Sequence, residues 1–165
     1  MKKIGILSDS HDNMKLLKKA VEKLNKLEID LVLHAGDIVA PFSARLLGEL
    51  NAPVRFVFGN NDGERQLLRK VVGELNSEID DFLETEFSGK NIALYHGTDR
   101  RILDLIVESQ RYFLVATGHT HEKYVKKVGN TLVVNPGELC GYLTGEATFA
   151  VLDLEEGEVQ FELLK

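Results

Sequence analysis

The chain has 165 residues, of which 44 % are hydrophobic and 28 % charged, and its formal net charge is −6. This composition excludes a disordered chain and predicts one domain over residues 1–165. The acidic balance supplies no field for nucleic acid or an anionic membrane, so a phosphate ligand would need a local positive charge. Apolar runs stay below about 18 residues, and the first is too short for a signal peptide, which predicts a cytoplasmic protein.

The first half of the chain alternates short apolar runs with amphipathic segments, a pattern typical of crossover units. Strands are expected at residues 2–8, 30–36 and 53–59. Helices are expected from about Asn13, from Pro41 and over residues 64–75. Asn13 suits an N-cap and Pro41 suits a first helical position. The second helix is expected to turn four apolar residues toward a core: Phe42, Leu46, Leu47 and Leu50.

The second half of the chain is richer in strands. Strands are expected at residues 81–87, 91–97, 112–118, 123–129, 131–137, 147–154 and 158–164, with one helix near 99–110. Glycine or asparagine in the segments 88–91, 128–131 and 155–158 predicts hairpin turns, because both residues tolerate positive backbone angles. So many strands exceed one modest sheet, and two packed sheets flanked by helices are therefore expected.

Polar side chains follow the ends of five of these strands. They are Asp9, His11, Asp37, Asn60, His96, His119 and His121. In an open α/β sheet, ligands bind beyond the carboxyl ends of the strands, so these side chains are expected to converge. The spacing of two within Asp9–His11 and within His119–His121 would place both members of a pair on one side of an extended backbone.

The chemistry of this set favours metal ions. Four histidines, two aspartates and an asparagine offer nitrogen and oxygen ligands without a thiolate. That mixture suits Mn, Fe, Ni, Co or Zn better than an oxygen-only Mg or Ca cage. Seven ligands exceed one tetrahedral site, so two ions bridged by a carboxylate are expected, an arrangement that holds the attacking and leaving oxygens of a phosphoryl group. Each residue alone also fits a simpler interpretation: Asn60 as a turn former, His119 and His121 as ordinary polar residues at a strand end.

Five short motifs occur in order along the chain: SDSH, HAGD, GNND, YHG and GHTH. Together they resemble the motif series of the calcineurin-like metallophosphoesterases, over nearly residues 4–137. The chain looks closest to the small single-domain phosphodiesterase branch of that family. The resemblance implies a mixed α/β (α+β) fold of four layers, α-β-β-α, in which two mixed sheets lie between helices.

The resemblance also implies a role for each ligand. Around the first metal it places Asp9, His11, Asp37 and His121. Around the second it places Asp37, Asn60, His96 and His119, with Asp37 as the bridge. The catalytic residues expected are Asp37, Asn60, Asn61 and His96, of which Asn61 and His96 would also contact the substrate. A water or hydroxide activated by the two divalent ions, with Mn or Ni preferred, would hydrolyse a phosphodiester bond.

Two positions depart from the family pattern. Many members have histidine where this chain has Asn61, and that histidine is thought to protonate the leaving group. An amide cannot act as a general acid near neutral pH, and such a group typically contributes roughly 10² to 10⁴ in rate. We therefore expect the highest activity on esters with good leaving groups, such as aryl phosphates. The second departure is Glu138, since the segment NPGE more often ends in serine in the family.

Other functions stay open at this point. A phosphomonoesterase is a close alternative, and a protein-interaction scaffold is another, because the branch includes a non-catalytic retromer subunit. The seven intact ligands favour an enzyme, and the partners expected are a small phosphodiester substrate and a second copy of the chain in a homodimer. The roles of His34, Glu138 and Cys140 are open, with His34 either supporting the site or acting as a hydrogen-bonded structural residue.

Overall fold

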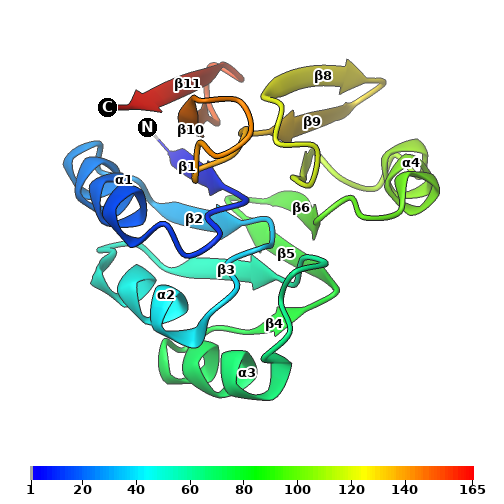
Figure 1. Cartoon of the computed structure of the whole chain (residues 1–165). Coiled ribbons are helices and arrows are strands. Elements are labelled where there is room, and N and C mark those ends of the chain that lie inside the picture. Colours follow the sequence, from blue (N-terminus) through cyan, green and yellow to red (C-terminus); the bar gives the residue numbers. More distant parts are fainter. Residues whose placement is uncertain (1) are drawn as a thin grey trace.

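The structure is a computed structural model that describes residues 2–165, and its strands form two sheets that pack face to face (Figure 1). The first sheet has six strands in the order β11 (Val159–Leu164), β10 (Ala147–Asp153), β1 (Lys3–Leu7), β2 (Leu31–His34), β3 (Val54–Val57) and β4 (Ile79–Asp80). Strands β1 to β4 run parallel, whereas β10 pairs antiparallel with β1 and β11. Ile4 of β1 pairs with Leu31 on one side and with Leu152 on the other.

The second sheet has five strands in the order β5 (Phe82–Phe87), β6 (Lys90–Tyr95), β7 (Leu114–Ala116), β9 (Thr131–Asn135) and β8 (Tyr124–Val128). Strands β6, β7 and β9 are parallel. Antiparallel hairpins join β5 to β6 and β8 to β9, and a third joins β10 to β11 in the first sheet. The three predicted hairpin turns are therefore confirmed.

Helices cover the outer faces of both sheets. On the first sheet lie α1 (Met14–Lys26), α2 (Pro41–Leu46), the short 3₁₀ helix η1 (Leu47–Glu49) and α3 (Arg65–Glu74), and on the second lies α4 (Arg100–Glu108). Figure 1 shows α1, α2 and α3 together on one side of the molecule and α4 on the other. The predicted four-layer α-β-β-α fold is confirmed.

Three apolar layers separate these four layers. Ile4 and Ile6 of β1 point into the layer between the sheets, since alternate residues of a strand face opposite sides. Gly5 faces α1, and a Cβ there would lie 2.6 Å from a Leu24 methyl, so its lack of a side chain lets α1 pack closely on the sheet. The third layer, between α4 and the second sheet, includes Leu103 and Val115.

Two details of the first half differ from expectation. Phe42 is 57 % exposed, so the prediction that it faces the core is wrong. Asp12 accepts hydrogen bonds from Ala40 N at 2.9 Å and Ser43 Oγ at 2.6 Å, which fixes the start of α2 so that Ser43 rather than Phe42 is buried. The other miss is β4, whose two residues are too few to show a strand period.

Candidate metal centre

All seven predicted ligands lie on loops that follow parallel strands. The loops come after β1 (Asp9, His11), β2 (Asp37), β3 (Asn60), β6 (His96) and β7 (His119, His121). Backbone hydrogen bonds tie the first two loops together, because Asp9 N donates to Gly36 O and His11 N donates to Asp37 O, each at 3.0 Å. The structure therefore brings the seven side chains to one edge of the two sheets.

Three of these loops, those after β1, β2 and β7, contain left-handed rather than extended backbone. In these three loops the residues other than glycine with φ between 40° and 77° are Asp9, His11, Asp12, Asp37, Val39, His119 and His121. Such angles cost an L-residue roughly 1–2 kcal/mol, and strain of this kind concentrates at functional sites. The expectation that extended backbone aligns Asp9 with His11 is therefore wrong, because tight turns place these two side chains together.

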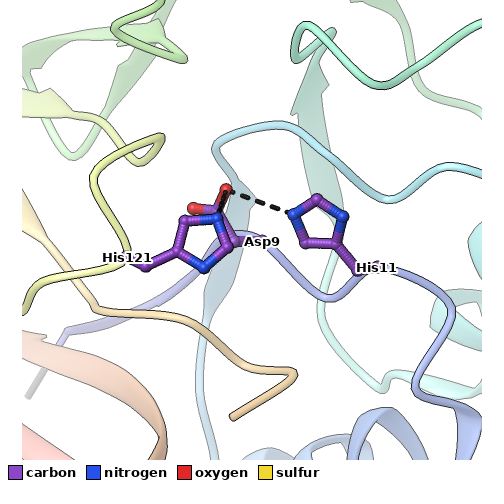
Figure 2. A group of neighbouring side chains, drawn as sticks. All are labelled: Asp9, His11 and His121. Carbon is purple, nitrogen blue, oxygen red and sulfur yellow. Dashed lines mark ion pairs between the residues drawn. The ribbon is translucent and has the colours of Figure 1, made fainter. Parts of the chain in front are cut away.

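The first cluster consists of Asp9, His11 and His121 (Figure 2). Oδ1 of the fully buried Asp9 lies 3.7 Å from His11 Nε2 and 3.3 Å from His121 Nε2. The other oxygen of Asp9 accepts hydrogen bonds from Ser8 Oγ at 2.7 Å and His119 N at 3.1 Å. Within residues 2–165, Asp9 Oδ1 and His11 Nε2 are buried atoms that have no hydrogen-bond partner.

The second cluster surrounds His96. Its Nδ1 lies 2.7 Å from Ala35 O, and because a carbonyl only accepts, Nδ1 carries the ring hydrogen. In the neutral ring Nε2 then presents a lone pair, 3.3 Å from Asp37 Oδ2 and 3.1 Å from Asn60 Oδ1. Asp37 Oδ2 also lies 3.4 Å from His11 Nε2 and so faces both clusters. Electron-rich atoms gathered in this way require a cation, either a proton or a metal ion.

Two asparagines and His119 complete the centre on its solvent side. His119 Nδ1 lies 3.0 Å from Asn60 Oδ1, and its ring centroid is 5.2 Å from that of His96. Asn61 donates from its backbone N and from Nδ2 to the two oxygens of Asp37, at 2.8 Å and 2.9 Å. The Asn61 side chain therefore orients the carboxylate that faces both clusters.

The electrostatics keep the two aspartates ionised. Burial of Asp37 favours the neutral acid, but the His96 imidazole and the Asn61 donors outweigh burial and lower the Asp37 pKa below its ordinary value. The pKa of Asp9 is lowered in the same way, mainly by His11 against the effect of burial. The Asp9 carboxylate raises the pKa of His11, and burial of His96 is overcome by Asp37 and Asp9, so the pKa of His96 is raised as well.

These residues fit divalent metal ions. Asp9, His11 and His121 offer ligand atoms within 4.8 Å of one another, and so do Asp9, Asp37 and His96. A buried carboxylate oxygen without a partner, such as Asp9 Oδ1, is costly unless a cation compensates it. The mixture of imidazole nitrogen and carboxylate oxygen is a donor set that transition metals prefer.

Asp62 supports the centre from below, a role that the sequence interpretation missed. Its buried carboxylate accepts hydrogen bonds from the backbone N atoms of Asp37, Val39 and Gly59, at 3.0, 2.7 and 2.7 Å. Burial raises the pKa of Asp62 against these three donors. The bonds hold Val39 at φ 77°, a strained angle for a β-branched residue, and so fix the loop that carries Asp37.

His34 is a structural support rather than a ligand. Its Nδ1 accepts from Gly36 N at 3.3 Å, so the ring hydrogen is on Nε2, which lies 3.0 Å from Ser10 Oγ. Full burial lowers the pKa of His34 to about 4, which keeps the ring neutral. The imidazole therefore joins the loop after β1 to the loop after β2.

Glycines allow the loops to approach one another. A Cβ on Gly59 would lie 2.1 Å from Asp37 Oδ1, and one on Gly118 would lie 1.9 Å from Ser8 Oγ. Neither distance is possible for a real side chain, so glycine is required here for close packing and not for a positive φ. The glycines next to the motifs are thus part of the architecture of the centre.

The four-layer fold, with a histidine and aspartate cluster at the carboxyl ends of its parallel strands, defines a metallophosphoesterase type of α/β protein. Residues 1–157 match the family model described as the calcineurin-like phosphoesterase superfamily domain. The chain belongs to this superfamily. Membership implies divalent metal ions, and the two ligand groups around Asp9 are the candidates to hold them.

Known proteins of similar sequence and structure cover almost the whole chain. A phosphodiesterase of Methanocaldococcus jannaschii is 41 % identical over 158 residues, covering 94 % of this chain and 95 % of the relative. The solved structure of an archaeal phosphodiesterase has a TM-score of 0.94 at 40 % identity and covers 98 % of this chain and 99 % of its own. Vacuolar Protein Sorting 29 from Cryptosporidium parvum shares the fold, with a TM-score of 0.70 at 18 % identity and coverage of 99 % and 96 %.

Membrane insertion finds no support among the helices. Across residues 2–165, none of them combines the length and the apolar character that crossing a bilayer requires.

Proposed function

We propose that this chain is a phosphodiesterase that depends on two divalent metal ions and hydrolyses small phosphodiesters. The observation that carries the proposal is the convergence of unpaired ligand atoms around Asp9 and Asp37. The name of the Methanocaldococcus relative supports the choice of a diester. The acidic surface adds a physical reason for the metal ions, because a chain of net charge −6 needs a local positive centre to bind a phosphate.

Two groups of residues, which share Asp37, would hold the two ions. The first ion would be held by Asp9, His11, Asp37 and His121, and the second by Asp37, Asn60, His96 and His119. Asp37 is the proposed bridge because its Oδ2 lies within 3.4 Å of His11 Nε2 and 3.3 Å of His96 Nε2. Mn and Ni are the proposed metals among those that suit nitrogen and oxygen donors.

Bound at this centre, divalent ions would supply Lewis acidity and lower the pKa of a water toward about 7. The chain's own contribution is orientation. Ala35 O fixes the His96 ring through Nδ1, and the two Asn61 donors fix the Asp37 carboxylate. Asn60 and Asn61 are exposed beside it, where a phosphodiester would enter from solvent.

The side chain at position 61 does not supply a proton to the leaving oxygen. At the position where the family resemblance implies a histidine, this chain has Asn61, whose side-chain NH₂ already donates to Asp37. An amide does not release a proton near neutral pH, so the leaving group would depart as an anion or take its proton from water. Esters with good leaving groups, such as aryl phosphodiesters, are therefore the proposed best substrates.

Metal analysis and hydrolysis assays test this function together. The purified protein is stripped with a chelator, reloaded with Mn or Ni, and assayed with an aryl diester and an aryl monoester. Metal-dependent turnover with preference for the diester is expected. Preference for the monoester would replace the proposal with a phosphomonoesterase, and metal binding without turnover of either ester would favour a scaffold. A cytoplasmic location and a homodimer are part of the same proposal. Sedimentation of the purified protein tests the homodimer.

A further inference from the structure

Glu138 is a buried acid next to the metal centre that the ligand assignment does not use. It follows β9, and because β9 runs parallel to β7, Glu138 reaches the same edge as His121. Its side chain is fully buried, which is unusual for a glutamate unless it has partners. The partners show what the carboxylate does.

Every contact of this carboxylate is with a hydrogen-bond donor. Oε1 accepts from Leu143 N at 2.9 Å, Thr144 N at 2.6 Å and Thr144 Oγ1 at 2.7 Å. Oε2 lies 2.5 Å from His121 Nδ1 and 3.3 Å from Cys140 Sγ, and it also accepts from Leu143 N at 3.2 Å. His121, Glu138 and Cys140 are close enough to hold a metal ion, but a carboxylate filled by donor hydrogens has no free lone pair for one.

These contacts decide which nitrogen of His121 carries the hydrogen. Glu138 has only acceptor atoms here, so the neutral His121 ring must donate from Nδ1. Its Nε2 then presents a lone pair on the side of Asp9 Oδ1, which lies 3.3 Å away; Figure 2 marks this contact with a dashed line. In the other tautomer, Nε2–H would donate to Asp9 and the lone pair needed by a metal ion would be lost.

We propose that Glu138 is a positioning residue that holds His121 in the Nδ1–H tautomer and so directs Nε2 toward the metal beside Asp9. The proposal rests on the metal-dependent function proposed above. Two carboxylates, Glu138 and Asp9, compete for the ring hydrogen of His121, and the shorter contact, 2.5 Å against 3.3 Å, is with Glu138. Carboxylates that accept from the second nitrogen of a metal-binding histidine are a general means of fixing the ligand.

The same carboxylate anchors the segment 141–146, which borders the centre. Leu143 is 75 % exposed, so its side chain has few packing contacts. The hydrogen bond from its backbone N to Glu138 is therefore a main contact that holds this residue in position. Thr144 is held by two donors to the same oxygen. Glu138 therefore links the order of this segment to the orientation of His121.

The test compares Glu138→Gln with a matched control, Thr144→Val. The glutamine keeps one acceptor oxygen, which the three donors of residues 143 and 144 should retain, so its NH₂ group faces His121 Nδ1 and removes the acceptor for that ring hydrogen. Thr144→Val removes one contact of Glu138 and leaves His121 untouched. The readouts are the His121 tautomer from ring ¹⁵N shifts in the metal-free protein at alkaline pH, where an imidazole is neutral, Mn affinity by titration, and amide exchange at residues 143 and 144.

For Glu138→Gln we expect a loss of the single Nδ1–H tautomer and Mn binding weaker by roughly 10- to 100-fold at one of two sites. The Thr144→Val control should retain the tautomer and the Mn affinity while its amides exchange faster. An unchanged tautomer and affinity in Glu138→Gln would overturn the proposal, and so would an Nε2–H tautomer in the wild type, a measurement that needs no variant to fold. Absence of hydrolysis by the wild type would overturn the phosphodiesterase function only, because the tautomer is measured without metal or substrate.

Discussion

At the carboxyl ends of the parallel strands, seven residues other than glycine adopt positive φ. The three hairpin turns lie at the opposite edge of the sheets, and there positive φ falls on Gly89, Gly129 and Gly157, with Ser88 as the exception. The backbone conformation is similar at both edges. A hairpin turn needs only the angle, which glycine supplies without strain. The ligand loops need the angle and a side chain together, so they accept strain at Asp9, Asp37 and the neighbouring histidines.

The strain at the ligand edge is maintained by buried polar contacts. Asp62 fixes the Asp37 loop through three backbone amides, and His34 joins that loop to the one after β1. At the hairpin edge, Gly89 and Gly157 are not closely packed, because a Cβ added to either residue would meet nothing within 4 Å. Changes at the ligand edge should therefore alter chemistry, and changes at the hairpin edge should alter only stability.

The largest effect is expected for Asp37→Ala, which removes the carboxylate that faces both clusters. Loss of several kcal/mol of charge stabilisation corresponds to a decrease in kcat/KM of roughly 10³-fold or more for an aryl diester. Bound metal per chain, measured after dialysis, should fall as well. Wild-type turnover by the variant would show that the converged ligand atoms are not the active centre.

A second prediction concerns His34 and pH. The pKa of the buried ring is about 4, against an ordinary value of 6.5, so between these values the unfolded chain binds more protons than the folded one. Stability from this group is complete above pH 6.5 and is lost as the pH falls toward 4, by on the order of 3 kcal/mol.

The measurement is urea unfolding of the metal-free protein between pH 7.5 and 5. His34→Gln keeps a donor for Ser10 but does not titrate, so the variant should be less stable at neutral pH and should lose less stability than the wild type on acidification. Parallel curves for the two proteins would show that His34 does not titrate in this window.

Gly59→Ala tests the close packing of the ligand loops. The new Cβ would collide with Asp37 Oδ1 at 2.1 Å, and a displacement of about 1 Å at a reacting centre can cost roughly 10²-fold in rate. The control is Gly63→Ala in the same loop, where an added Cβ meets nothing within 4 Å. Activity should fall in the first variant and persist in the second. Equal losses in both would point to general disturbance of the loop.

Asn61→His sharpens the chemistry of the same loop. An imidazole at this position introduces a general acid, so activity should rise on esters with poor leaving groups, by roughly 10²-fold, the lower end of the range typical of such catalysis. Aryl diesters should gain nothing from the imidazole, because their leaving groups need no proton, and loss of the Nδ2 donor to Asp37 should affect all esters of the series alike. A series of diesters graded by leaving-group pKa measures this as a shallower dependence in the variant. The same slope in both proteins would contradict the role assigned to Asn61.

The sequence was sufficient to predict the layers and the convergence of Asp9, His11, Asp37, His96 and His121, and insufficient for the supports of the centre. Asp9, Asp37 and His96 stand out because polar residues directly follow apolar strands, and that signal depends only on local order along the chain. Asp62 and Glu138 follow strands too, but their partners are backbone amides or residues on loops that follow other strands. Such contacts depend on loop geometry that periodicity does not encode. The exposure of Phe42 was missed for the same reason, since Asp12 sets the start of α2 from another loop.

The smallest effect is expected at the hairpin edge. Gly89 has φ 72° in the two-residue turn between β5 and β6, and alanine there should lower the free energy of unfolding by roughly 1 kcal/mol. Ser88→Asn in the same turn should stabilise slightly, because Asn-Gly is the preferred pair for a turn with two positive φ values. Both variants should retain wild-type kcat/KM and Mn affinity. A loss of activity in Gly89→Ala at a temperature where it is folded would mean that the two edges are coupled through β6, which carries the turn at one end and His96 at the other.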